Sequence, residues 1–204
     1  MMSSENIRSP DIAVFISGRG SNLLKLLEKE KDGTLKGRIR YVYSDKKIAP
    51  GLEHAAAFGK ECGAFPFNTA GRDSLLAILG REHISLVVLA GFMRVLPADF
   101  IKAFKGVIVN IHPALLPSFP GLDAQKQAFE HGVKISGATV HIVDDTLDGG
   151  PIILQHACSI EGCASAEEVS ARILKIEHEL YAKALNLILN VSWKVEGRRF
   201  IYED

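Results

Sequence analysis

Short runs of consecutive apolar residues alternate along this chain with segments in which apolar residues recur every three or four positions. Runs at 12–16, 86–90 and 107–111 contain almost no polar residue, which is typical of strands buried on both faces of a parallel sheet. Two less continuous runs, 38–43 and 64–67, predict further strands. Helical spacing follows the strands and predicts helices near residues 23–27, 51–62, 72–83 and 97–104. This alternation predicts a doubly wound, parallel α/β sheet that binds ligands beyond the carboxyl ends of its strands.

The pattern changes after residue 112. A helix is expected at 123–132 with Asp123 as N-cap, then two strands at 137–143 and 151–159 around an acidic loop. The longest helical pattern covers residues 165–189, with Ser165 as its expected N-cap. Two short strands at 193–196 and 199–202 are expected to form a closing hairpin. We therefore expect an α/β fold with a mostly parallel, Rossmann-like sheet, an added strand–loop–strand unit and a long C-terminal helix. Residues 1–11 are expected to form a flexible tail, and 12–204 a single domain.

Composition narrows the class of protein. Of 204 residues 47% are hydrophobic, and 24 basic residues balance 24 acidic ones, so a core can form and no basic surface for nucleic acid is expected. Three cysteines without close pairing favour a reducing compartment. The first ten residues lack the apolar segment of a signal peptide, and no apolar run reaches membrane-spanning length. These features predict a cytoplasmic protein with no membrane partner.

The most informative stretch for chemistry is 107–121. Asn110 and His112 alternate on the predicted strand, so both side chains should point to the same side of the sheet. Pro113 ends the strand, and further prolines stiffen the loop after it. An amide N–H can stabilise an oxyanion, and an imidazole can move a proton near neutral pH. The alternative is a strand end at which the two side chains satisfy nearby backbone groups.

A second candidate is the glycine-containing turn 17–22, which joins the first strand to its helix. Backbone N–H groups in such a turn, together with the helix N-terminus, can bind a phosphate group. The turn is neither GxGxxG nor a Walker motif, so a monophosphate fits better than a dinucleotide or nucleoside triphosphate. The alternative is a tight turn capped by Ser21 or Asn22.

Three further features leave alternatives open. The acidic loop 144–150 is either solvated or supplies Asp148 as a partner for His112. His141 either faces the same cleft as His112 or, as we favour, is a satisfied core residue. The apolar side chains of residues 94–96 either seal the core or form the wall of a pocket for a flat ring. The remaining histidines and cysteines do not match a zinc-site spacing, so no metal is expected.

Four segments, taken together, resemble the phosphoribosylglycinamide formyltransferase family of folate-dependent enzymes of purine synthesis. They are Ile16–Leu23, Leu89–Arg94, Asn110–Pro117 and Leu147–Pro151. The resemblance extends from about residue 12 to residue 189. It implies transfer of a formyl group from 10-formyltetrahydrofolate to the primary amine of glycinamide ribonucleotide, without a metal, by a monomer or homodimer.

The resemblance also implies roles for individual residues. Asn110, His112 and Asp148 would be the catalytic group. The substrate phosphate would lie on Gly18, Gly20, Ser21 and Asn22, in a phosphate-binding half formed by residues 12–111. Glu177 would hold the amine end of the ribonucleotide. The residues implied to bind the folate are Arg72, Met93, Arg94, Val95, Leu96, Asp144 and Asp148. Residues 112–204 are expected to form the folate and catalytic half, which includes the C-terminal helix.

Three other readings are weighed against this one. The hydrolase of formyltetrahydrofolate shares the Asn/His/Asp group but normally carries an N-terminal regulatory domain. Methionyl-tRNA formyltransferase shares the group and adds a C-terminal tRNA-binding domain. We expect neither addition in this chain. A binding module without turnover is disfavoured because Asn110, His112 and Asp148 are all present.

Overall fold

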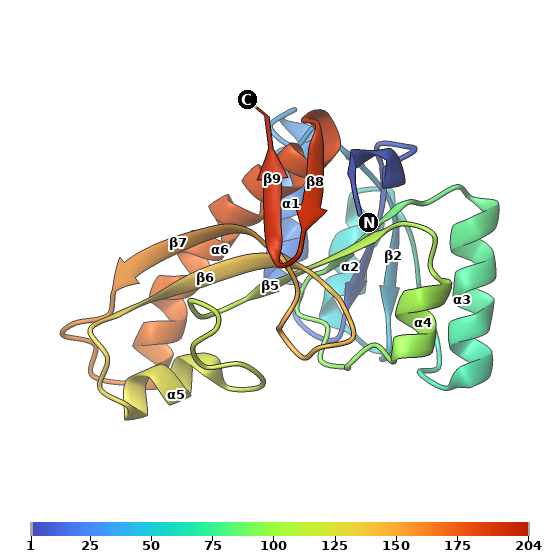
Figure 1. Ribbon diagram of the computed structural model, residues 1–204. Coiled ribbons are helices and arrows are strands. Elements are labelled where there is room, and N and C mark those ends of the chain that lie inside the picture. The colour runs from blue at the N-terminus through green and yellow to red at the C-terminus, as the bar shows by residue number, and fades with distance from the viewer. Residues whose placement is uncertain (1, 204) are drawn as a thin grey trace.

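One nine-stranded sheet organises the part of the chain, residues 2–203, that the computed structural model describes (Figure 1). Its strands are β1 (Asp11–Ile16), β2 (Arg38–Ser44), β3 (Glu61–Ala64), β4 (Leu86–Leu89), β5 (Val107–His112), β6 (Ile135–Ile142), β7 (Ile152–Ser159), β8 (Trp193–Glu196) and β9 (Arg199–Tyr202). The order across the sheet is β3-β2-β1-β4-β5-β6-β7-β9-β8. The first five strands pair in parallel, and β6 runs antiparallel to both β5 and β7. The predicted fold class is confirmed.

Helices cover both faces of the parallel part of the sheet (Figure 1). They are α1 (Ser21–Lys31), α2 (Pro50–Ala57), α3 (Thr69–Arg81), α4 (Ala98–Ala103) and α6 (Ala166–Asn190), while α5 (Ala124–Glu130) packs on α6. Successive residues of β1 alternate between the two layers: Ile12 and Val14 pack with α1 and α6, whereas Ala13 and Phe15 pack with α3 and α4. A strand buried on both faces needs an apolar residue at every position, and this is why β1 reads as an unbroken apolar run.

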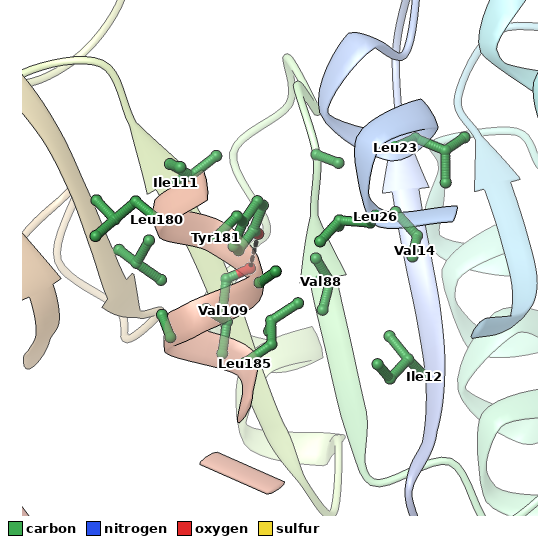
Figure 2. Close-up of a cluster of buried hydrophobic side chains, with 14 of the residues drawn as sticks. Ile12, Val14, Leu23, Leu26, Val88, Val109, Ile111, Leu180, Tyr181 and Leu185 are labelled. Atoms are coloured by element: carbon green, nitrogen blue, oxygen red, sulfur yellow. Dashed lines mark hydrogen bonds between the residues drawn. The ribbon is translucent and has the colours of Figure 1, made fainter. Parts of the chain in front are cut away.

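Helix α6 is held to the sheet by a buried tyrosine as well as by apolar packing. Leu180, Tyr181 and Leu185 lie against strands β4 and β5 (Figure 2). The Tyr181 hydroxyl lies 2.9 Å from the Leu89 carbonyl oxygen and 3.1 Å from that of Val109. Burial raises the pKa of Tyr181 well above its ordinary value, so the phenol stays protonated and donates to these carbonyls. The helix is therefore fixed just below the strand ends where the candidate residues lie.

Several predicted boundaries are wrong. Strand β3 lies three residues earlier than expected, at 61–64, because α2 ends at Ala57 instead of continuing to residue 62. Gly59 adopts a φ of +69°, a left-handed conformation that ends a helix and turns the chain into the strand. Asp123 is also left-handed, with a φ of 57°, and its side chain does not cap α5 among the described residues. The predicted N-cap at Ser165 is confirmed, since its side chain accepts from the Glu168 N–H.

The N-terminal segment lies against the sheet, in contrast to the loose tail that the sequence suggests. A 3-10 helix, η1 (Ser4–Asn6), follows a backbone bridge between Ser3 and Lys194. The Val195 N–H donates to the Met2 carbonyl, and the Arg8 N–H donates to the Ser85 hydroxyl at 3.0 Å. Between residues 2 and 203, the structure contains no helix with both the length and the apolar character needed to cross a bilayer.

Candidate active site

Strands β5 and β6 bring together three polar side chains, Asn110, His112 and His141, at the edge of the parallel part of the sheet. Asn110 is directly opposite His141 in the antiparallel register, and His112 is opposite Thr139. Directly opposite residues share a face, so the expected same-side placement of Asn110 and His112 is confirmed. The acidic loop adds Asp148, whose carboxylate lies 3.5 Å from His112 Nδ1 and 3.7 Å from His141 Nε2. An amide, two imidazoles and a carboxylate thus form one cluster.

The orientation of the His112 ring is fixed by the backbone of the proline loop, which we define as residues 113–121. His112 Nε2 lies 2.7 Å from the Phe119 carbonyl oxygen. A carbonyl oxygen only accepts, so Nε2 carries a hydrogen and Nδ1 is the ring atom that faces Asp148. The Gly121 N–H donates to Asp148 Oδ2 at 2.7 Å. The proline loop therefore holds both members of the His112–Asp148 pair.

His141 belongs to the cluster, whereas the sequence favoured a core role. Its Nδ1 lies 3.1 Å from the Ile142 carbonyl oxygen, and its Nε2 lies 3.2 Å from the Asn110 amide nitrogen. Burial lowers the pKa of His141, against smaller opposing effects of Ile142 and Asp148. A neutral ring that donates through Nδ1 has a lone pair on Nε2, and this lone pair accepts one Asn110 N–H. The second Asn110 N–H is left for a ligand. Sequence reasoning missed this role because only strand register places His141 opposite Asn110.

The acidic loop needs unusual backbone geometry to place Asp148. Asp148 has a φ of 49°, in the left-handed region that is uncommon for residues other than glycine. The loop returns to β7 through Gly150, where an added Cβ would lie 1.9 Å from the Ile142 carbonyl oxygen. A side chain at this position is therefore excluded by close backbone contact. Asp144 lies at the start of the loop and accepts from the Thr146 N–H at 2.8 Å, so its side chain makes a local turn hydrogen bond.

The turn at the start of α1 is built from backbone alone. Gly20 is the N-cap residue, with a φ of 73°, and no side chain in the described part of the chain caps this helix end. The alternative that the sequence left open, a turn capped by Ser21 or Asn22, does not describe this helix end. The first intrahelical bond runs from the Leu24 N–H to the Gly20 carbonyl, so the preceding N–H groups are left unpaired by the helix. Unpaired N–H groups at a positive helix end can bind an anion.

The Asn22 side chain turns away from this helix end. Its Nδ2 donates to Glu177 Oε2 on α6 at 2.7 Å. Both residues are buried, and burial raises the pKa of Glu177 against the opposing effect of the Asn22 hydrogen bond. Asn22 Oδ1 has no hydrogen-bond partner among the described residues. Asn22 can therefore offer a ligand its backbone N–H, while its side chain orients Glu177.

The segment after β4 presents a mixed surface near the same strand ends. Met93 and Val95 are 61% and 70% exposed, whereas Leu96 is buried. The Met93 N–H donates to the Ser17 hydroxyl at 2.8 Å, and Arg94 Nε donates to Asp45 at 2.8 Å. Burial tends to raise the pKa of Asp45, but hydrogen bonds from Ser17 and Arg94 outweigh this and hold the pKa below its ordinary value. Two exposed apolar side chains are thus available to a flat ring, beside a fixed guanidinium.

Arg72 is brought close to Arg94 by an aromatic ring that the sequence did not single out. The guanidinium carbons of Arg72 and Arg94 lie 5.5 Å and 5.9 Å from the centre of the Phe67 ring. Arg72 also lies 4.0 Å from Asp99. Phe67 therefore supports two cations beside the exposed apolar segment, and this arrangement suits a carboxylate-bearing ligand.

Metal ligation receives no support from the geometry. Across residues 2–203, no three His, Cys, Asp or Glu side chains are grouped so that they could hold a metal ion. Cys62, Cys158 and Cys163 are free thiols. The amide, imidazole and carboxylate groups of the cluster can hydrogen-bond to a developing oxyanion and transfer protons.

Comparisons with known proteins agree with this geometry. Residues 11–185 match the Formyl transferase family. The chain is 38% identical over 199 residues to the phosphoribosylglycinamide formyltransferase of Escherichia coli, which covers 95% of this chain and 91% of the relative. It is 40% identical over 190 residues to the trifunctional purine biosynthetic protein adenosine-3 of Drosophila melanogaster, covering 90% of this chain and 14% of that one. The structure of glycinamide ribonucleotide transformylase 1 from Symbiobacterium toebii matches with a TM-score of 0.90 at 42% identity, over 95% of this chain and 94% of that chain.

Proposed function

The chain belongs to the Formyl transferase family, and from this premise we propose that it transfers a formyl group from 10-formyltetrahydrofolate to the primary amine of glycinamide ribonucleotide, in purine biosynthesis. This is the reaction named by the phosphoribosylglycinamide formyltransferases to which the chain is similar. The observation that carries the proposal is the cluster of Asn110, His112 and Asp148 beside an uncapped helix N-terminus on the same sheet edge. The first feature suits acyl transfer and the second suits a phosphate-bearing substrate.

The proposed reaction forms one bond and breaks one. The amine nitrogen of the ribonucleotide attacks the formyl carbon and gives a tetrahedral intermediate with a negative oxygen. The bond from that carbon to the folate nitrogen then breaks, and a proton from the amine is transferred to the departing nitrogen. The N–H of Asn110 that His141 leaves free is suited to the negative oxygen. His112, with its Nδ1 facing Asp148, is suited to the proton transfer.

The ribonucleotide is proposed to place its phosphate on the N-terminus of α1. The ligand groups there are the backbone at Gly18, Gly20, Ser21 and Asn22. Glu177 is proposed to hold the amine end, because its carboxylate is oriented by Asn22 beside this helix end. Burial disfavours the ionised form of Glu177, and a bound ammonium would reverse that preference.

The folate is proposed to lie along the segment after β4. Met93, Val95 and Leu96 would contact its ring system, and Arg72 and Arg94 its carboxylates. Asp144 and Asp148 would border the ring from the acidic loop. A cytoplasmic location and a monomeric or homodimeric state remain predictions from the sequence.

Product analysis with 10-formyltetrahydrofolate tests the proposal directly. We expect formylated ribonucleotide to appear in equal amount to the tetrahydrofolate released, and negligible release of formate when the ribonucleotide is omitted. Formate release at the same rate with and without the ribonucleotide would replace the transferase reading by a hydrolase reading.

A further inference from the structure

A threonine and a glutamine on neighbouring strands hold the beginning of the proline loop. Thr139, on β6, is fully buried. Its hydroxyl donates to the Ala114 carbonyl at 2.6 Å and accepts from the Leu116 N–H at 3.0 Å. Gln155, directly opposite Thr139 on β7, donates through Nε2 to the Leu116 carbonyl at 2.8 Å and to the Thr139 hydroxyl at 2.9 Å. We call these two side chains the loop clamp.

The hydroxyl of Thr139 and the amide nitrogen of Gln155 are fully hydrogen-bonded within the loop clamp. A hydroxyl has one donor and two acceptor sites, and Thr139 uses all three. An amide nitrogen has two hydrogens, and both Gln155 hydrogens are donated. Pro113 and Pro117 lack N–H groups, so the loop cannot continue the sheet ladder. The clamp replaces that ladder and fixes Ala114 and Leu116 relative to β6.

The far end of the same loop holds the cluster. The Phe119 carbonyl accepts from His112 Nε2, and the Gly121 N–H donates to Asp148. Between the clamp and these contacts, the Ser118 N–H donates to the Leu115 carbonyl at 3.0 Å. Pro117 has a fixed φ, and Ser118, the one other residue between Leu116 and Phe119, is held by its bond to Leu115. A displacement at Leu116 is therefore transmitted to Phe119 through this short, restrained segment.

We propose that Thr139 and Gln155 are positioning residues for formyl transfer: they set the orientation of His112 and Asp148 through the backbone of the proline loop. This inference rests on the proposed function. Neither side chain contacts His112 or Asp148 directly in the hydrogen bonds of the described residues. His112, Thr139 and Gln155 lie directly opposite one another on β5, β6 and β7. A substitution on β7 can therefore alter the cluster two strands away.

The kinetic test compares Thr139→Val and Gln155→Leu with Thr139→Ser. Valine matches threonine in shape but removes the hydroxyl, whereas serine retains it. We expect each of the first two variants to lower kcat by about 10- to 100-fold, because displacement of reacting groups by about 1 Å costs on that order. Both KM values should stay within about twofold, since the substrate-contacting groups are unchanged. Thr139→Ser should restore kcat to within about threefold of the wild type.

Ser136 provides a matched control on the same strand. It is buried, and its hydroxyl has no hydrogen-bond partner among the described residues. Ser136→Ala therefore removes a buried β6 hydroxyl without touching the loop clamp, and kcat should be unchanged. If Ser136→Ala and Thr139→Val lower kcat equally, the effect is a general one of altering β6 and the proposal is overturned.

A second readout does not depend on turnover. In ¹⁵N-histidine-labelled protein, the His112 Nε2 proton should exchange slowly because it is bonded to Phe119; comparison with His112→Asn assigns its signal. We expect rapid exchange in Thr139→Val and Gln155→Leu, and slow exchange in Thr139→Ser and Ser136→Ala. Slow exchange in folded Thr139→Val and Gln155→Leu overturns the proposal, whatever their kcat. If the wild type forms no formylated ribonucleotide, the proposed function fails, and the exchange rates still decide whether the clamp positions His112.

Discussion

The two ends of the candidate site use different kinds of chemical group, backbone at one end and side chains at the other. Beyond β1, the anion-binding end consists of backbone N–H groups that a left-handed glycine leaves uncapped. Beyond β5 and β6, the proposed catalytic end consists of side chains whose orientation is set by hydrogen bonds from other strands and loops. The first end should fail when a Cβ is added, and the second should fail when a polar atom is removed. The comparison therefore predicts different kinetic consequences for substitutions at the two ends.

The largest loss of activity is expected when a side chain of the proposed catalytic end is truncated. Asn110→Ala removes the amide proposed to stabilise the oxyanion, and loss of one such donor costs about 10²–10³-fold in kcat. Affinity for a folate analogue should change far less, because the interaction forms mainly in the transition state. Steady-state kinetics and equilibrium binding of the analogue measure the two quantities. A large loss of analogue affinity with unchanged kcat would contradict the role proposed for Asn110.

The next largest effect is expected on ribonucleotide binding, when the backbone of the anion-binding end is displaced. At Gly20 an added Cβ would lie 2.8 Å from the Gly51 Cα, and the φ of +73° disfavours any side chain. Gly20→Val should therefore raise KM for the ribonucleotide by roughly 10-fold or more, because the anion-binding backbone is displaced. Folate-analogue affinity should be retained.

Gly80 supplies the control for this variant. It lies in α3, a Cβ there meets no atom within 4 Å, and its φ is not positive. Gly80→Ala should leave both substrates unaffected, and circular dichroism should show that both variants are folded. Equal loss of ribonucleotide and folate affinity in a folded Gly20→Val protein would mean that the two ends are not separate.

The same contrast explains how much the sequence alone reveals. The turn at 17–22 is predictable because strand, glycine turn and helix are consecutive, and the alternating hydrophobic pattern locates most strands in the same way. Asn110 and His112 are predictable because a strand places alternate residues on one side. The link between Asn110 and His141, 31 residues apart, depends on antiparallel register, which hydrophobic pattern does not specify for a strand buried on both faces.

The position of β3 and the direction of the Asn22 side chain could not be predicted from the sequence, for related reasons. Strand β3 contains Glu61, Cys62 and Gly63, none of which signals a strand, so propensity placed it later in the chain. The Asn22 side chain is drawn from the helix end by Glu177, a residue 155 positions away. Long-range polar partners of this kind override local capping preferences, because a buried carboxylate without a partner is costly.

A smaller effect should appear when His141 is changed. His141→Phe removes the acceptor that orients Asn110, and we expect kcat to fall about 10-fold, less than on loss of Asn110 itself. The pH dependence of unfolding gives an independent check. Because burial lowers the pKa of His141, the unfolded state takes up a proton first as pH falls, so this residue costs stability below about pH 6.5.

The difference in unfolding free energy between wild type and His141→Phe should therefore change between pH 7.5 and 5.5. The wild type should lose more stability than the variant over this range, as followed by urea denaturation at each pH. Parallel stability curves would show that His141 is not held neutral, and its proposed acceptor role would then lose its basis.

The smallest effect is expected for Glu177, which is hydrogen-bonded to Asn22 beside the anion-binding end. Burial raises its pKa above the ordinary value of 4.5, so below about pH 4.5 both states are protonated and the residue has no pH-dependent cost. As pH rises, the unfolded state ionises first, and native stability is lost until the folded-state pKa is passed. Glu177→Gln keeps an oxygen for the Asn22 N–H but cannot ionise. Its melting temperature should exceed that of the wild type by a few degrees at pH 8, with about 2–4 °C expected per kcal/mol, and the advantage should disappear near pH 4.5.

Glu179, two residues further along α6, is the matched control, because its pKa is shifted in the opposite direction from that of Glu177. A hydrogen bond from Lys29 lowers the pKa of Glu179, so its ionised form favours the native state and Glu179→Gln should give no stability gain at pH 8. Ribonucleotide KM should rise in Glu177→Gln and stay unchanged in Glu179→Gln, because only Glu177 is oriented by Asn22 beside the anion-binding end. A Glu177→Gln protein that gains stability but keeps its KM would leave Glu177 as a buried partner of Asn22 with no part in substrate binding. A rise in KM without the pH-dependent gain would mean that Glu177 is already ionised in the free protein, with its charge stabilised by the surrounding fold.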